Sequence, residues 1–251
     1  MEIFLTTDGL VSLFTLTVME IILGIDNIIF ISIVVGKLPE HQQPRARTLG
    51  LLLALVFRIL LLLGISWLIG LTYPVIEIEG LPPAFSLSWR DIILIAGGIF
   101  LMTKTVLEIH QKLEGEEDVL KRPEVNSFMA VVAQIIALDM VFSFDSILTA
   151  IGLVEHVEIM IAAVVIAMGI MMVAARAISN YINKRPTMKM LALSFLMLIG
   201  FMLVAEGFDQ HVEKGYIYFA MAFAFVVELL NSRLRKKETE PVKLRERLKQ
   251  E

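Results

Sequence analysis

The sequence predicts an all-α polytopic membrane protein with seven transmembrane helices, arranged as two inverted three-helix repeats plus one extra helix. Three observations carry this prediction. Hydrophobic residues make up 57% of the 251 residues and the mean hydropathy is +0.77, whereas ordinary globular chains are about 45–50% apolar. Several windows contain the roughly 20 apolar residues that a helix needs to cross a bilayer. A short pattern of acidic and polar residues also occurs twice, in the first and fourth of these windows.

The predicted helices follow one another along the chain. They lie near residues 10–36, 48–71, 92–112, 127–152, 158–179, 188–208 and 214–232. Together they form one membrane domain over residues 1–235, with repeat one at about 10–112, repeat two at about 127–208 and the extra span at about 214–232. Residues 236–251 form a charged tail that carries both signs of charge. No second domain is predicted.

Basic residues in the connecting segments predict the orientation, because short cytoplasmic loops carry an excess of Lys and Arg. Such residues follow the first, third and fifth spans, and they are frequent after the last span. The intervening segments 75–88 and 153–158 contain no Lys or Arg. We therefore expect the N-terminus outside and the C-terminus, with its charged tail, in the cytoplasm.

The repeated pattern is EIILGIDN at Glu20–Asn27 and DMVFSFDS at Asp139–Ser146. The alignment pairs Glu20 with Asp139, Asp26 with Asp145 and Asn27 with Ser146. A second similarity pairs GIFLMTK at 98–104 with GFMLVAE at 200–206. Each unit contains three spans, an odd number, so the two units are inverted in the membrane. Inverted repeats with polar interruptions are typical of secondary transporters.

Helix geometry limits how the acidic residues can meet. Six residues of a regular helix turn about 600°, so Glu20 and Asp26 point about 120° apart. Convergence therefore needs either an interrupted helix or a site shared between spans. Gly24 and the Asp26-Asn27 pair are weak helix formers. These residues would permit a local break in the first span, and Ser143 and Ser146 give similar latitude in the fourth.

Four acids within apolar spans require compensating positive charge, because one charge at the bilayer centre costs about 2.5–3.5 kcal/mol. The candidate metal ligands are Glu20, Asp26, Asn27, Asp139, Asp145 and Ser146. Such oxygen ligands suit Mg, Mn or Ca, and the chain has no cysteine to supply a thiolate. The alternative is ion pairing with the basic residues inside spans, Arg58, Lys104 and Arg176. Three further residues are candidates for positions beside the metal site or along the ion path: Lys104, Glu206 and Arg58.

The two motifs resemble those of the TerC family of integral membrane proteins, which carry EIxLGIDN in one half and DxxFSxDS in the other. The likeness extends to about Arg235 and matches the short bacterial form. The family is named for tellurium resistance, and the resemblance implies manganese efflux across the bacterial cytoplasmic (inner) membrane. It thus implies a non-enzymatic exporter with Mn(II) as the transported ion and no permanent cofactor. Ligand spacing and composition alone indicate only a hard divalent cation.

Other classes of membrane protein fit less well. An intramembrane aspartyl protease normally carries GxGD, and Gly24-Ile25-Asp26 lacks the first glycine. A retinal-binding pump needs a lysine in the middle of its seventh span, and residues 215–231 contain none. A non-transporting partner of the secretion machinery that assists metal loading stays open, as does an exporter of another small solute. The expected partners are the divalent ion and the lipid bilayer, and no nucleic acid.

Overall fold

Long helices account for most of the structure. The computed structural model describes residues 6–78, 85–113, 127–151, 156–210 and 213–238. Seven of its helices are long and apolar enough to cross a membrane. They are α1 (Thr7–Val35), α2 (Gln43–Leu63), α4 (Trp89–Leu113), α5 (Phe128–Ile151), α6 (Val157–Asn183), α7 (Pro186–Gly207) and α8 (Lys214–Glu238). The prediction of an all-α polytopic membrane protein is confirmed, and the inverted repeat stays a prediction.

Local sequence explains where several helices begin. The Thr6 hydroxyl accepts a 3.1 Å hydrogen bond from the Gly9 N–H and so caps α1. Helix α7 begins at Pro186, where the missing N–H of proline leaves no helical hydrogen bond unmade. The apolar composition of the helices then favours burial or lipid contact along their length.

Of the two ways in which the motif acids could meet, the structure does not use a break in the first span, because α1 is helical without interruption from Thr7 to Val35. Gly24 has a different role there. A Cβ atom added at Gly24 would collide with the Met171 sulfur on α6. The glycine therefore permits close packing of α1 against α6. A continuous helix means that the motif acids keep the 120° separation set by regular helical geometry.

The segment after the second span differs from the prediction. Helix α2 ends at Leu63, and Gly64 separates it from the short helix α3 (Ile65–Gly70), whereas the sequence predicted one span to residue 71. Strands β1 (Pro74–Ile78) and β2 (Phe85–Ser88) pair antiparallel in a region treated as a loop. Ile78 is opposite Phe85, and the register shifts between Pro74 and Ile76.

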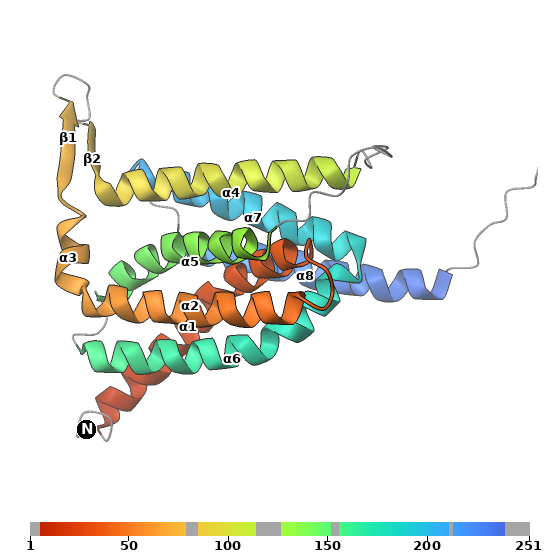
Figure 1. The fold of residues 1–251 in the computed structure, drawn as a ribbon, viewed down its shortest axis with the longest axis horizontal. Coiled ribbons are helices and arrows are strands. Elements are labelled where there is room, and N and C mark those ends of the chain that lie inside the picture. Colours follow the sequence, from red (N-terminus) through yellow and green to blue (C-terminus); the bar gives the residue numbers. More distant parts are fainter. Residues whose placement is uncertain (1–5, 79–84, 114–126, 152–155, 211–212, 239–251) are drawn as a thin grey trace, which may run out of the picture. The chain divides into compact units, whose positions relative to one another are not determined.

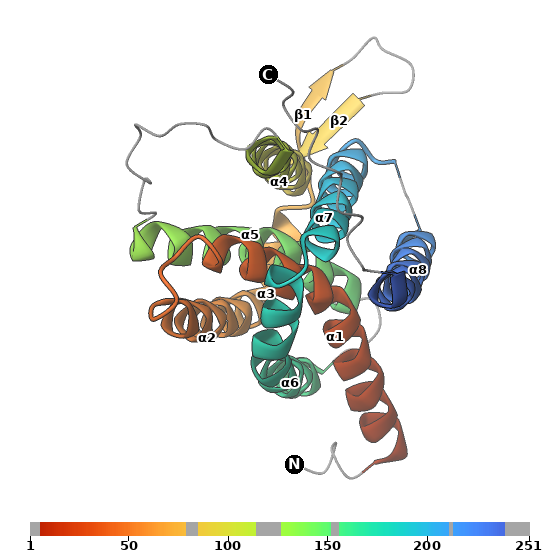
Figure 2. The same ribbon diagram turned by 90° about the vertical axis from the view of Figure 1, so that its right-hand side faces the viewer.

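The chain divides into two compact units, residues 1–212 and 213–251, and α8 belongs to the second. In the first unit, α4 packs against α7, α1 against α6, and α2 against both α5 and α6. Figures 1 and 2 show α4 beside α7, and the hairpin β1–β2 at one end of this unit. We call this end the β end. The opposite end contains the connection from α1 to α2 (Figure 1).

Helices α4 and α7 approach each other at two glycines. A Cβ atom added at Gly98 would lie 2.6 Å from the Gly200 carbonyl oxygen, and one added at Gly200 would lie 3.0 Å from the Gly98 carbonyl oxygen. Larger side chains would therefore force the two backbones apart. Gly98 and Gly200 occupy matched positions in the two proposed repeats. Helix α1 likewise contacts α5, which brings the two acidic motifs to the same part of the bundle.

Candidate metal centre

The structure buries all the predicted metal ligands within protein. They are Glu20, Asp26, Asn27, Asp139, Asp145 and Ser146, with at most 6% of any residue exposed. Three of them lie on α1 and three on α5. Buried polar groups need hydrogen-bond or charge partners. The site is therefore defined by which partners these side chains reach.

Arg58 of α2 joins the first acid of each motif. Its Nη1 atom lies 2.6 Å from Glu20 Oε2 and its Nη2 atom lies 2.9 Å from Asp139 Oδ1. Its Nε atom also donates to Asp139 Oδ2 at 3.2 Å, which makes the contact to Asp139 bidentate. Arg58 itself is only 3% exposed. Two carboxylates from different helices thus share one buried guanidinium, a geometry that Arg forms better than Lys.

Two neutral side chains complete this group. Asn27 Nδ2 donates to Asp139 Oδ1 at 2.9 Å, and Ser143 Oγ donates to Asp139 Oδ2 at 3.1 Å. We call Glu20, Asn27, Arg58, Asp139 and Ser143 the Arg58 cluster. The side-chain carbonyl oxygen of Asn27, Oδ1, is buried and has no hydrogen-bond partner among the described residues. The cluster thus contains one acceptor that is removed from water and unsatisfied.

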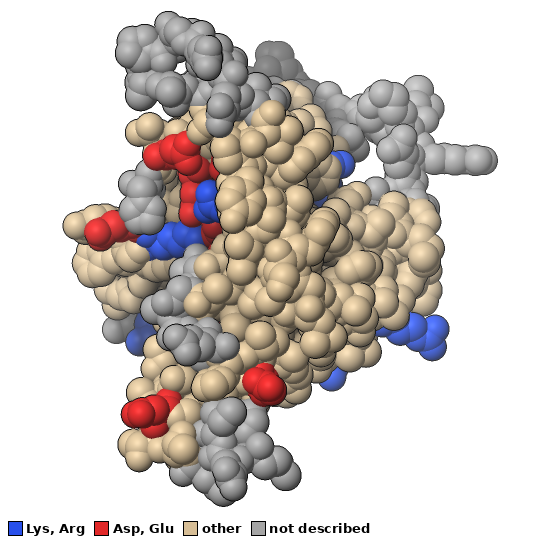
Figure 3. All heavy atoms as spheres, turned by 90° about the vertical axis from the view of Figure 1, so that its left-hand side faces the viewer, with Lys and Arg blue, Asp and Glu red and all other residues tan. Residues whose placement is uncertain are grey.

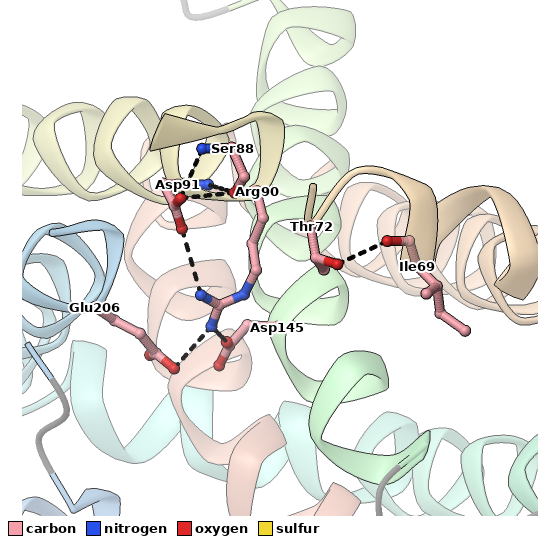
Figure 4. A network of polar contacts seen from close by, with 7 residues as sticks. All are labelled: Ile69, Thr72, Ser88, Arg90, Asp91, Asp145 and Glu206. Carbon is pink, nitrogen blue, oxygen red and sulfur yellow. Dashed lines mark hydrogen bonds and ion pairs between the residues drawn. The ribbon is translucent and has the colours of Figure 1, made fainter. Parts of the chain in front are cut away.

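The second acid of the α5 motif has a different partner. Asp145 Oδ1 lies 3.0 Å from Arg90 Nη2, and the same nitrogen lies 3.1 Å from Glu206 Oε1 on α7. Arg90 Nη1 is 3.5 Å from Asp91 Oδ1. Figure 4 shows the Arg90 guanidinium between these three carboxylates. We call Arg90, Asp91, Asp145 and Glu206 the Arg90 cluster.

The Arg90 cluster lies at the β end of the bundle. Asp91 Oδ2 accepts hydrogen bonds from the backbone N–H and the hydroxyl of Ser88, at 2.8 and 2.6 Å, so the end of β2 holds this carboxylate in place. A cavity of about 570 Å³ adjoins the cluster, and Arg90 and Asp91 are among its lining residues. Figure 3 shows acidic and basic side chains next to each other on this face. The cluster therefore separates the buried interior from an open cavity.

A third charged group lies toward the opposite end. Glu108 of α4 is 5% exposed and forms ion pairs with Lys37, which follows α1, and with Lys189 of α7, the latter at 3.3 Å. A cavity of about 60 Å³ is lined by Lys37, Glu108 and Lys104, among others. The Lys104 ammonium lies 5.8 Å from the centre of the Phe100 ring. We call Lys37, Glu108 and Lys189 the Glu108 cluster.

The predicted ligands therefore do not form a single site. The Arg58 cluster contains Glu20, Asn27 and Asp139. Asp145 instead pairs with Arg90. The Ser146 hydroxyl donates to the Ser143 backbone carbonyl at 3.2 Å. Asp26 is buried, at 2% exposure, on α1. Within the described part of the chain, no group of three His, Cys, Asp or Glu residues is placed to hold a metal ion. The alternative of ion pairing describes the contacts of Arg58 with Glu20 and Asp139.

Residues 5–241 match the family model described as "Integral membrane protein TerC family". The chain belongs to the TerC family. It is 54% identical over 217 residues to the UPF0053 inner membrane protein YgdQ of Escherichia coli K12, covering 86% of this chain and 90% of YgdQ. It is 47% identical over 227 residues to a UPF0053 protein of Haemophilus influenzae, covering 90% and 94% of the two chains. No solved structure matches the chain.

Other relatives are longer than this TerC-family chain. The inner membrane protein YoaE of E. coli K12 is 45% identical over 237 residues, which are 94% of this chain and 45% of YoaE. The shared region is thus nearly the whole of this chain and less than half of YoaE. The prediction from the two motifs that the chain is a TerC-family membrane protein is confirmed.

Sequence reasoning about this TerC-family chain missed Arg90 and Asp91, which bind the second acid of the α5 motif and the end of the hairpin. Both residues lie in the first turn of α4, at the edge of an apolar segment, where charged residues normally face water. One signal was available: an acid in the first turn complements the helix dipole and is expected to accept nearby N–H groups. The contact of Arg90 with Asp145 joins positions 55 residues apart, which local patterns do not predict.

Proposed function

We propose that this TerC-family chain is an inner-membrane transporter that exports a divalent metal ion, Mn(II), from the cytoplasm. The observation that carries the proposal is the buried Asn27 carbonyl oxygen, which has no hydrogen-bond partner among the described residues. It belongs to a side chain bonded to Asp139, which in turn shares Arg58 with Glu20. A buried acceptor without a donor costs free energy, and a cation would satisfy it.

The ligand chemistry of the Arg58 cluster supports a hard cation. The Asn27 amide group donates to a carboxylate, so its carbonyl oxygen is turned away from Asp139 and is available to a ligand. This oxygen and the carboxylates of Glu20 and Asp139 are the donor types that Mn, Mg and Ca accept. Support for Mn(II) in particular comes from the family resemblance, because these ligands do not separate it from Mg(II).

Arg58 has a defined role in this proposal. Its guanidinium occupies the space between Glu20 and Asp139 that a cation would need. It therefore compensates the two buried carboxylates while no metal is bound, and an arriving divalent ion competes with it. This competition would let the site empty and refill without leaving unpaired charges in the membrane interior.

The two other charged groups would control access to the Arg58 cluster. The Arg90 cluster links α4 and α7 to α5 at the β end, and the Glu108 cluster links α4 and α7 to the end of α1. Alternating access requires that a path opens at one end while the other is closed. With the N-terminus outside, the β end faces the exterior, and ions leave past Arg90.

Mn(II) flux into liposomes that contain the purified chain tests this function. The parent protein should move Mn(II) across the membrane, detected by an indicator sealed inside the vesicles. Replacing Asn27 by Leu removes the carbonyl oxygen at similar size and should reduce flux about 10–100-fold. Asn27→Gln retains both the side-chain carbonyl oxygen and the N–H donor that Asp139 accepts, and it should keep more of the flux than Asn27→Leu.

The control variant is Ser194→Ala, since this exposed hydroxyl bonds only within its own helix, to the Met190 carbonyl. It should transport at the parent rate. No Mn(II) flux by the folded parent would contradict the proposal and favour a non-transporting partner of the secretion machinery. Parent flux in Asn27→Leu would place the ion elsewhere.

An exporter of another small solute is the second candidate, and one observation favours it. The cavity of about 60 Å³ is lined by Lys37 and Lys104 together with Glu108, so basic groups outnumber acidic ones. Such a lining suits an anionic group better than a cation. Mn(II) flux measured with and without added small carboxylic acids separates the two candidates. At constant free metal concentration, these acids should leave flux through a cation site unchanged.

A further inference from the structure

Arg47, in the first turns of α2, is a buried basic residue that the proposed ion path does not use. It is 6% exposed, and its Nη2 atom donates to the Ser179 hydroxyl on α6 at 3.0 Å. Its Nε atom is buried and has no hydrogen-bond partner among the described residues. An unmade hydrogen bond on a buried charged group is costly. Arg47 therefore has a donor that a ligand could satisfy.

Arg176 brings a second positive charge to the same place. It lies on α6, three residues before Ser179, so the two side chains share a helix face. Because Arg47 donates to Ser179, the Arg176 side chain lies one helical turn from this contact, on the same face of α6. In the described ranges, neither arginine forms an ion pair with an acidic residue. Two nearby cations repel each other, and an anion between them would remove that repulsion.

The contrast with Arg58 is direct. Arg47 and Arg58 are the two arginines that the structure describes as buried. Arg58 meets two carboxylates, whereas Arg47 donates to the neutral hydroxyl of Ser179. Arg58 is thus compensated within the protein, and the charge of Arg47 is left for a partner of opposite sign.

Ser179 supplies a third donor. Its oxygen accepts hydrogen bonds from Arg47 and, at 3.4 Å, from Asn183 Nδ2. These two bonds leave the hydroxyl proton for a further acceptor. Asn183 is held in turn by a 3.2 Å bond to the Ser32 carbonyl at the end of α1. The donors around Arg47 are therefore positioned by contacts among three helices.

The location matches the boundary between lipid tails and headgroups. Arg47 is about 6 Å along α2 from its start, and Arg176 is about 10 Å from the end of α6. Val173, one turn before Arg176, is 82% exposed. This apolar side chain shares a face with Arg176 and offers a contact to acyl chains. Basic pockets between transmembrane helices bind lipid headgroups in this way.

We propose that Arg47, Arg176 and Ser179 form a site between α2 and α6 for a phosphate-ester anion, supplied by the headgroup of an anionic membrane lipid. The guanidinium groups bind the phosphate oxygens, and the Ser179 hydroxyl donates to one of them. The acyl chains lie along the exposed apolar face of α6. The site is separate from the Arg58 cluster and does not depend on the transported ion.

Binding to the delipidated full chain in detergent tests the site, with phosphatidylglycerol as the probe. The lipid should bind and raise the melting temperature, whereas diacylglycerol with the same chains should do neither. Arg176→Gln should weaken lipid binding about tenfold, the loss of one charge-assisted hydrogen bond. Because Arg176 is exposed, this variant should fold even if Arg47→Gln does not.

Arg45→Gln is the matched control, since Arg45 is exposed, carries the same charge and lies two residues from Arg47, on another face of α2. It should alter lipid binding less than twofold. An equal loss in Arg45→Gln and Arg176→Gln would overturn the site in favour of general charge attraction. Stabilisation by inorganic phosphate but not by the lipid would overturn the lipid assignment, and no effect of either would overturn the anion site.

Discussion

Two arginines bind acids from the same α5 motif, and their surroundings differ. Arg58 is 3% exposed, and its guanidinium contacts carboxylates on α1 and α5 within the bundle. The Arg90 side chain is 21% exposed, lies beside a cavity of about 570 Å³ and meets three carboxylates. Asp139 and Asp145 are six residues apart, so a regular helix directs them about 120° from each other. The α5 motif thus places one acid in the Arg58 cluster and the other in the Arg90 cluster.

The difference in exposure predicts how each cluster responds when one of its charges is removed. Removing one charge from the Arg58 cluster leaves others buried without compensation, which is costly. Water can reach the Arg90 cluster from its cavity and replace lost contacts there, so its ion pairs are weaker and can open. A gated ion path needs a buried centre whose charges are compensated and an outer group whose ion pairs can open. The Arg58 cluster and the Arg90 cluster have these two properties.

The largest expected effect is the loss of the Arg58 guanidinium. Arg58→Gln leaves Glu20 and Asp139 buried and unpaired, and it should lower the free energy of unfolding by about 3–5 kcal/mol. Arg90→Gln is the matched comparison and should cost roughly 1 kcal/mol. Thermal unfolding of both purified variants in the same detergent measures the difference. Equal losses would contradict the distinction between the two clusters.

A smaller effect concerns the coupling between Arg58 and Asp139. A double-mutant cycle with Arg58→Gln and Asp139→Asn should give an interaction energy of about 1–3 kcal/mol, because the residues share two hydrogen bonds. The same cycle between Arg58 and Asp145 should be additive within about 0.5 kcal/mol, since Asp145 belongs to the other cluster. Strong coupling in both cycles would indicate one continuous site.

The smallest expected effect is the response to salt. Raising the ionic strength from about 0.1 M to about 1 M shortens the screening length from about 10 Å to about 3 Å. The stability difference between the parent and Arg90→Gln should then shrink by a few tenths of a kcal/mol. The difference for Arg58→Gln should stay constant, because dissolved salt screens buried charge pairs much less than exposed ones. Unfolding measured at both salt concentrations checks this, and equal salt sensitivity would argue against it.

Most of the helical framework was predictable from apolar content, and the exceptions have local causes. Predicted spans such as 10–36 and 127–152 correspond closely to Thr7–Val35 and Phe128–Ile151. The short helix α3 was missed because apolar residues continue past Gly64 and hide the end of α2. Gly24 suggested a break by its low helix propensity, whereas α1 is continuous there and the glycine leaves room for Met171 of α6.

Three properties could be predicted from the sequence: the number of long helices, the burial of the motif residues and the angle between acids six positions apart. These properties follow from composition and from the period of one helix. The tertiary structure decided the partner of each acid. Arg58 meets Asp139 across 81 residues because α2 packs against α5, and Arg90 meets Glu206 across 116 residues because α4 packs against α7. Such contacts depend on which helix faces meet in space, and local patterns along one helix do not contain that information.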